Sequence, residues 1–241
     1  MDHAAFIEAV RRDGAGFRTA VTHASLTASV ASCPGWTLAD LVHHTTEAHY
    51  FWASVITMSA TSPNDVPRLP RPSDDDLLDA LDTHCAALLV AVESTPADTE
   101  VWTWAADHSV AFVVRRLAHE TAIHRWDAES TAGTVHDLDA ALSSDGIDEF
   151  LEHFMPDVRQ DAEPVGGSVH IHCGDVSGEW TIRPDRDGYD VTREHAKGDC
   201  ALRGPAGNLF LALWRRVGAD AVDVVGDAGV ATRFLAATNL D

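Results

Sequence analysis

One stretch near the middle of the chain constrains the fold more than any other. From Ala105 to Thr131 there is no proline or glycine, and the apolar residues recur at helical spacing, so a single long helix is predicted here. Glu120 and His124 are four residues apart, which places them roughly 40° from each other around that helix. They fall on the same side as its apolar residues, namely Val110, Val113, Val114, Leu117 and Ala128. The helix is therefore expected to direct a carboxylate and an imidazole into an apolar interior.

The buried carboxylate needs a compensating group. A charge buried without a partner costs several kcal/mol, which is on the order of the whole stability of a small domain. A metal ion is the first candidate, because Glu and His are both common metal ligands. His119 is not part of the pair, since it lies five residues from His124, roughly 140° around the helix, and points away. The alternative is a buried Glu–His ion pair that braces the helix within the core.

Two ligands do not hold a catalytic metal, so a third is expected on another helix. Thr37 is a good N-cap for a helix that runs to about residue 59. His44 falls inside the apolar arc of this helix, whereas the adjacent His43 falls outside it. His49 also faces inward and is the rival of His44. The sequence thus predicts a site made of Glu120 and His124 with one histidine of this second helix.

Asp127 is the only other inward carboxylate on the central helix, one position around the same face as Glu120. A carboxylate beside a metal-bound histidine commonly fixes the orientation of its ring. We therefore expect Asp127 to orient a ligand or to move a proton.

The pattern divides the chain into two domains. Helices are expected at 3–30, 37–59, 74–93, 105–131 and about 137–153. After the boundary from Pro156 to Gly167 the hydrophobic period changes from helical to alternating. Strands are expected at 168–173, 179–184, 188–193, 199–203 and 222–225, with helices at 206–217 and 228–238. This predicts an all-α four-helix bundle over residues 1–157 and a small α+β domain over residues 165–241.

The charge and the cysteine usage exclude several classes of protein. The net charge is −21, from 17 basic and 38 acidic residues, which argues against binding to nucleic acid or to an anionic membrane. No apolar run reaches about 18 residues, so no membrane span is expected. The four cysteines are scattered, with no C-x-x-C motif, and the N-terminus lacks the pattern of a signal peptide. We expect a cytoplasmic protein with reduced thiols.

Two further histidines lie in the predicted C-terminal domain. His170 and His172 alternate on one face of the strand expected at 168–173. No carboxylate cluster accompanies them in the sequence, so we expect them to be structural.

Two segments resemble the motifs of mycothiol-dependent maleylpyruvate isomerase-like proteins, which belong to the DinB-like superfamily of metal-binding helical bundles. The first is the run Pro-Gly-Trp-Thr-Leu-Ala-Asp-Leu-Val-His-His at 34–44, and the second is His-Glu-Thr-Ala-Ile-His-Arg-Trp-Asp-Ala-Glu at 119–129. Weaker similarity to the second domain of the family is found at 203–206, 213–216 and 225–227. The resemblance covers nearly the whole chain, and its ligand positions fall on His44, Glu120 and His124, which agrees with the angular argument.

The resemblance implies a zinc site, or one for another divalent metal, with open positions for water or a thiol. The thiol would be mycothiol, whose pKa the metal lowers so that it becomes a nucleophile at neutral pH. No nucleophile of the protein is then needed. In an isomerase the thiolate adds to an activated cis double bond, the carbon–carbon bond rotates and the thiol leaves, whereas in an S-transferase it stays on the electrophile. The resemblance also implies an arginine that binds the anionic thiol or substrate, for which Arg216 fits best and Arg215 is the alternative.

Two other functions stay open at this point. Two histidines and one carboxylate also form the facial triad of Fe(II) enzymes that use oxygen. A fourth protein ligand, from His49 or Asp127, would instead close the site and indicate a binding protein stabilised by a structural metal. The expected partners are a small thiol and a small electrophilic substrate, with no nucleic acid and no membrane.

Overall fold

The structure is a computed structural model that describes residues 1–186 and 188–240. The chain divides into two compact units, residues 1–136 and the part that begins at Asp137. Asp187 and Asp241 fall within the predicted C-terminal domain but lie outside the described residues.

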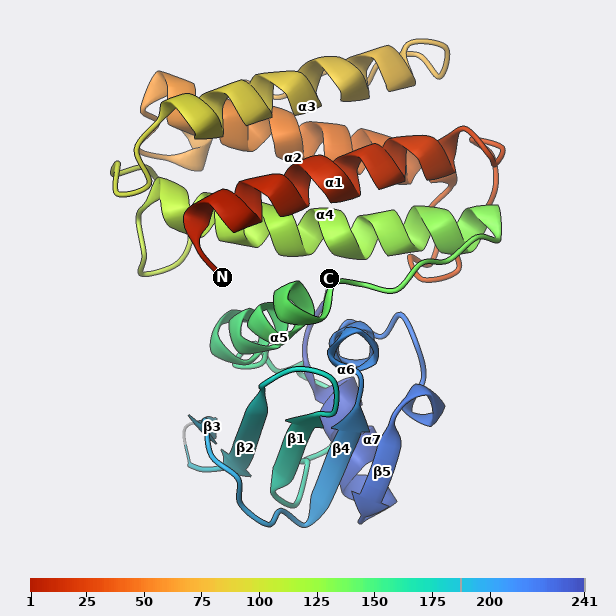
Figure 1. Ribbon diagram of the computed structural model, residues 1–241, viewed down its shortest axis with the longest axis vertical. Coiled ribbons are helices and arrows are strands. Elements are labelled where there is room, and N and C mark those ends of the chain that lie inside the picture. Colours follow the sequence, from red (N-terminus) through yellow and green to blue (C-terminus); the bar gives the residue numbers. More distant parts are fainter. Residues whose placement is uncertain (187, 241) are drawn as a thin grey trace. The chain divides into compact units, whose positions relative to one another are not determined.

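The first unit is a bundle of four helices (Figure 1). They are α1 (His3–Val21), α2 (Leu38–Met58), α3 (Leu77–Ser94) and α4 (Val110–Ala132), with a short 3₁₀ turn at Pro63–Asp65. The most extensive packing is between α1 and α4 and between α2 and α3. The prediction of a four-helix bundle is thus confirmed. The first helix ends earlier than expected, because the chain turns at Thr22 and bends repeatedly before α2.

The start of α2 is fixed by Thr37, the N-cap that the sequence predicts, which forms a capping box with Asp40. The Thr37 hydroxyl accepts a hydrogen bond from the backbone N–H of Asp40, and the Asp40 carboxylate accepts one from the backbone N–H of Thr37 at 2.9 Å. Hydrogen bonds from Thr37, together with Arg71, lower the pKa of Asp40 to about 2. This cap sets where α2 begins and therefore which of its residues face the core.

Helix α4 is buried on almost every side, and its charged residues are paired across the bundle. Arg125 reaches Asp13 of α1 at 3.0 Å and Glu129 of its own helix at 2.8 Å, and all three side chains are less than one tenth exposed. Gly16 leaves the space through which Arg125 passes, since a Cβ there would lie 2.7 Å from the Cδ atom of that arginine. The glycine that weakens α1 by propensity is thus required by packing.

The second unit is an α+β domain. Its helices are α5 (Ala140–Glu149), which continues as a π-helix to Phe154, α6 (Ala206–Leu213) and α7 (Ala228–Ala237), with a 3₁₀ turn at Ala219–Ala221. Its strands are β1 (Val169–Cys173), β2 (Glu179–Pro184), β3 (Tyr189–Thr192), β4 (Cys200–Gly204) and β5 (Asp223–Gly226). They form one sheet in the order β3-β2-β1-β4-β5, in which only β1 and β4 are parallel. The predicted small α+β domain is confirmed.

The division between the units lies before α5, whereas the sequence places this helix at the end of the bundle. Helix α5 packs against α6, and the ring of Phe210 lies so close to Gly146 that a Cβ there would be 2.6 Å from it. The apolar face of α5 is evident in the sequence, but its packing partner is not. The units therefore separate at residues 136 and 137 rather than between 157 and 165.

Among the described helices, none combines the length and the apolar character that a membrane crossing requires.

Replacement of Gly16 by alanine is expected to destabilise the protein by about 1–3 kcal/mol, because the added methyl group displaces Arg125 from its buried ion pairs. Replacement of Gly14, on the same helix, is the matched control. Its Cβ would meet only the Cys85 sulfur at 3.7 Å, so Gly14→Ala should stabilise by up to about 1 kcal/mol. Urea unfolding of the two variants measures the difference, and equal stabilisation by both would contradict this account of Gly16.

Candidate functional site

The structure brings the three predicted ligands together within the first unit. One donor atom from each of His44, Glu120 and His124 lies within 4.8 Å of the other two. The Nε2 atom of His44 is 3.4 Å from Oε1 of Glu120, and the imidazole rings of His44 and His124 are 5.0 Å apart at a steep angle. Ligands at zinc distances of about 2.0–2.1 Å in a tetrahedron are roughly 3.3 Å apart. The donor set and its spacing therefore fit a divalent metal ion.

Glu120 is held as a carboxylate by its neighbours. Burial by itself would raise its pKa, but the hydrogen bond with His44 and the charges of Arg116 and His124 outweigh burial and keep the pKa well below its usual range. Arg116, which is almost fully buried, places its Nε 3.5 Å from Oε2 of Glu120, while Oε1 faces His44. The two oxygens thus have separate neighbours, and Arg116 supplies part of the compensation that the sequence analysis assigned to a metal.

Asp127 lies behind His124 and fixes its ring. Its Oδ2 atom is 2.9 Å from Nδ1 of His124, and its Oδ1 atom accepts a hydrogen bond from the Ser32 hydroxyl at 2.6 Å. The thiol of Cys33 donates to Oδ2 at 3.7 Å. The Asp127 side chain is completely buried. With Nδ1 engaged by Asp127, the Nε2 atom of His124 is the nitrogen available to a metal.

The other histidines near the site lie apart from this group. His43 faces Glu47 at 3.4 Å, as its position outside the apolar arc predicts. His119 does point away from Glu120, but it is fully buried against the ring of Phe6. His49, the rival ligand, is buried, and burial lowers its pKa to about 4, which keeps it neutral. It is not among the three residues whose donor atoms converge.

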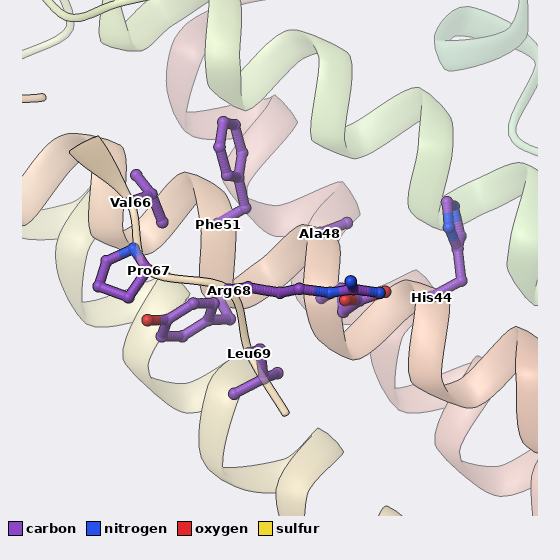
Figure 2. A pocket seen from close by; sticks show the side chains of 9 residues that line it. His44, Ala48, Phe51, Val66, Pro67, Arg68 and Leu69 are labelled. Atoms are coloured by element: carbon purple, nitrogen blue, oxygen red, sulfur yellow. The ribbon is translucent and has the colours of Figure 1, made fainter. Parts of the chain in front are cut away.

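A pocket of about 300 Å³ opens beside His44. Its wall is formed by one side of α2 and by the loop that follows α2, and its residues are His44, Glu47, Ala48, Tyr50, Phe51, Val66, Pro67, Arg68 and Leu69. Figure 2 shows the Arg68 side chain extending from this loop toward the side on which His44 lies. Arg68 is exposed and has no hydrogen bond or ion pair with another described residue. The pocket thus combines a largely apolar wall with the carboxylate of Glu47, the guanidinium of Arg68 and access to His44.

The two predicted arginines of the second unit have different surroundings. Arg215 has a left-handed backbone conformation (φ 57°), and its guanidinium donates to the carbonyl oxygens of Leu235, Ala236 and Thr238. Arg216 donates to the carbonyl oxygen of Trp214, and its guanidinium lies 6.0 Å from the ring of that residue. Arg215 therefore fastens the end of α7, which makes it the weaker candidate for an anion-binding residue.

His170 and His172 have no carboxylate cluster near them in the sequence, but the structure places one carboxylate and a third histidine beside them. Glu179 faces His172 across the β1–β2 pair, and His195 approaches from a loop, so that donor atoms of all four residues lie within 4.8 Å of one another. The sequence analysis missed this group because its members come from three separate segments. It also missed Arg116, although the spacing of four residues to Glu120 predicts that pair. No sequence pattern indicated a role for Arg68, because it lies in a proline-rich loop without helical or strand periodicity.

Comparison with known proteins places the chain in a family. Residues 7–129 match the family model of the mycothiol maleylpyruvate isomerase N-terminal domain, and residues 141–233 match that of the MDMPI C-terminal domain. Two solved structures share the fold over 95% of both chains at 14% identity: a mycothiol-dependent maleylpyruvate isomerase (TM-score 0.67) and its variant with one histidine replaced by alanine (TM-score 0.66). No curated protein matches the sequence. Since the two family models follow each other along most of the chain and the fold agrees, the chain belongs to the mycothiol maleylpyruvate isomerase family.

Proposed function

We propose that this protein is a metal-dependent isomerase that uses mycothiol as its thiol and acts on a small anionic substrate similar to maleylpyruvate. The observation that carries the proposal is the convergence of His44, Glu120 and His124 in a chain with both domains of the family. Zinc is the proposed ion, because two imidazoles and a carboxylate with a remaining open position are typical of catalytic zinc sites. A cytoplasmic location stays a prediction.

A zinc ion held by these residues supplies one chemical effect, which is to lower the pKa of a thiol so that it is a thiolate at neutral pH. Residues of the chain bind and position the ion. His44 and Glu120 offer Nε2 and Oε1, and Asp127 holds the ring of His124 so that its Nε2 can bind. Arg116 keeps the second oxygen of Glu120 engaged. An ion held by these two imidazoles and one carboxylate would keep a coordination position open for the thiol.

The cysteines of the chain support an external thiol. Burial raises the pKa of Cys85, of Cys173 to about 12 and of Cys200 to about 11, so these three are protonated at neutral pH. Cys33 is half-buried and donates to Asp127. A thiolate nucleophile is therefore expected to come from outside the protein.

The pocket beside His44 supports a small anionic substrate. An arginine pairs with a carboxylate in a bidentate manner, and Arg68 projects into this pocket without an ion pair to any described residue. Its volume of about 300 Å³ is at the lower end of the range for small-molecule sites. We infer that Arg68 binds a carboxylate of the substrate, while Arg216 remains a proposed binding residue for the thiol or the substrate.

The metal site is tested by metal content. His124→Ala should lose the ion bound at this site, whereas His43→Ala should keep it, because His43 faces Glu47 instead. Asp127→Asn should bind the same ion roughly 10–100-fold more weakly, since the ring of His124 loses its charged partner. Zinc titration of the metal-free variants, followed by elemental analysis, measures these differences. An unchanged number of bound zinc ions in His124→Ala would overturn the assignment.

The reaction is tested by the fate of the thiol. The purified protein should be inactive toward maleylpyruvate until mycothiol is added, and a substoichiometric amount of mycothiol should sustain complete conversion, because an isomerase returns its thiol. Consumption of one mycothiol per product would indicate an S-transferase instead. Cys33→Ser should remain active. Conversion by thiol-free protein would show that no external thiol is involved.

The anion-binding residues are tested by KM. Arg68→Ala should raise KM for the anionic substrate by about 10–100-fold, which corresponds to the loss of a charged hydrogen bond, while the zinc content stays unchanged. Arg71→Ala is the matched control in the same loop, because its charge is already paired with Asp40 at 2.7 Å. Arg216→Ala should weaken binding of the thiol or the substrate. Equal KM values for the Arg68 and Arg71 variants would exclude Arg68 from the site.

A further inference from the structure

One face of the sheet in the second unit carries histidines of β1, whereas the other face carries apolar residues. Strand β1 alternates, so that Val169, Ile171 and Cys173 point to one face, while His170 and His172 point to the other. The first three are buried, and β1 contacts α6 and α7. The two histidines therefore lie side by side on the opposite face of the sheet.

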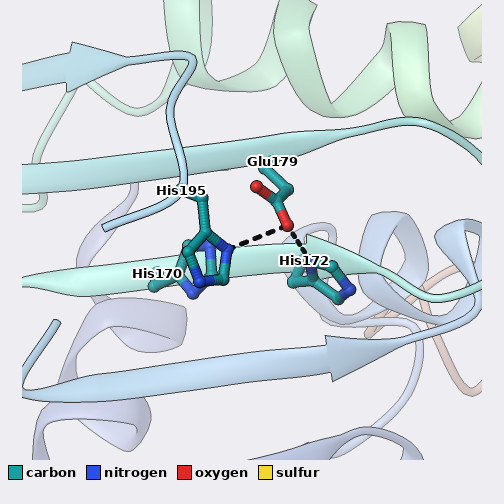
Figure 3. A group of neighbouring side chains, drawn as sticks. All are labelled: His170, His172, Glu179 and His195. Atoms are coloured by element: carbon teal, nitrogen blue, oxygen red, sulfur yellow. Dashed lines mark hydrogen bonds and ion pairs between the residues drawn. The ribbon is translucent and has the colours of Figure 1, made fainter. Parts of the chain in front are cut away.

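A carboxylate and a third imidazole complete the group (Figure 3). Glu179 of β2 is the direct cross-strand partner of His172. Its Oε1 atom contacts Nδ1 of His172 and lies 3.1 Å from Nδ1 of His195. The ring of His195 packs edge-on against that of His170, with 5.0 Å between centroids. Three imidazoles and one carboxylate thus converge on one point of the sheet.

The loop that carries His195 is fastened to the same face. Thr181, the cross-strand partner of His170, donates a hydrogen bond from its hydroxyl to the carbonyl oxygen of Glu194 at 3.0 Å. The side chain of Glu194 also accepts from Thr192 and Arg183. These contacts place residue 195 over β1 even though it belongs to no strand. The hydrogen bonds of Glu194, the residue before His195, thus fix the position of His195.

His170 indicates that the group is prepared for a ligand. It is 3% exposed, and its Nε2 atom is buried without a hydrogen-bond partner among the described residues. A buried polar atom that lacks a partner is unfavourable by about 1–3 kcal/mol. If the four side chains are held together only by hydrogen bonds, the unfavourable burial of this nitrogen remains. A metal ion bound by the imidazole of His170 would remove it.

We propose that His170, His172, Glu179 and His195 bind one divalent transition-metal ion, with zinc as the first candidate, at a site separate from the His44 group. Imidazole and carboxylate are the ligand types that zinc takes in proteins, and four protein ligands are typical of closed, structural sites. The separation of 3.1 Å between His195 and Glu179 is close to the edge of roughly 3.3 Å in a tetrahedral zinc site. The ion would fasten the loop after β3 to the sheet.

The charges around the group have both signs. Arg203 of β4 is the cross-strand neighbour of His172, and it is exposed to solvent. Its charge opposes the binding of a cation, but the screening by water around an exposed side chain reduces this effect. The carboxylate of Glu179 lies within the group itself and favours the cation at shorter range. A metal ion is therefore expected to bind despite Arg203.

The test is zinc stoichiometry of the full chain. After removal of metal with a chelator, Zn²⁺ is titrated into the protein and into His195→Ala, and bound zinc is counted after gel filtration. His195 is an exposed loop residue, so its replacement leaves the fold intact. His195→Ala should bind the ion of this group at least about 100-fold more weakly, which exceeds the usual effect of losing an outer partner of a ligand. The loss of one zinc equivalent is expected whether or not the His44 group binds metal.

His136→Ala is the matched control. His136 is as exposed as His195 and lies at the same 3.1 Å from a carboxylate, that of Glu129, but it belongs to neither group of converging donors. Its replacement should leave the stoichiometry unchanged. A variant with His44 and His124 both replaced by alanine should still bind one equivalent, and Co²⁺ in this variant should show the absorption of a tetrahedral site. Equal stoichiometry of His195→Ala and the unaltered protein would overturn the proposal.

Discussion

The burial of charged side chains on α4 is the constraint on which the rest of the first unit depends. Most side chains of α4 are buried, so its charged groups have little access to bulk water and need partners inside the protein. Arg125 is paired toward α1, Glu120 toward Arg116 and α2, and Asp127 toward the turn before α2. These pairs point in different directions, and together they fix the rotation of α4 about its axis. Since Glu120 and His124 lie on the same helix, the rotation that satisfies the pairs also sets the geometry of the candidate metal site.

Asp127 connects α4 with the turn that leads into the first sequence motif. The turn before α2 supplies the hydroxyl of Ser32 and the thiol of Cys33 to its carboxylate, and the carboxylate in turn holds His124. The same turn carries Trp36, whose ring lies 5.0 Å from that of His44. Thr37 then caps α2 and fixes the start of the helix seven residues before His44. The turn and the cap thus position His44 on α2, and the buried carboxylate positions His124 on α4.

The second unit shows how strand register can assemble a group that no local motif announces. His170 and His172 share a face because they are two residues apart in a strand, and Glu179 joins them because β2 pairs with β1 in one register. A shift of that register by one residue would turn Glu179 to the other face. His195 depends on a third segment, whose backbone is held by Thr181. The group therefore rests on pairings between segments that are distant in the sequence.

Much of the fold and part of the site follow from local sequence alone. Helical period, capping residues and the change to alternation predict the four helices, the strands and the order of the two units, because these signals act over a few residues. The spacing of Glu120, His124 and Asp127 on one helix predicts their common face for the same reason. The convergence of His44, and not of His49, with Glu120 and His124 depends on the tertiary structure, and so does the partner of α5. So do the pairing of Arg116 with Glu120 and the approach of His195 to β1. Each of these depends on which surfaces of separate elements meet, and an amphipathic pattern shows that a face is buried without showing what it is buried against.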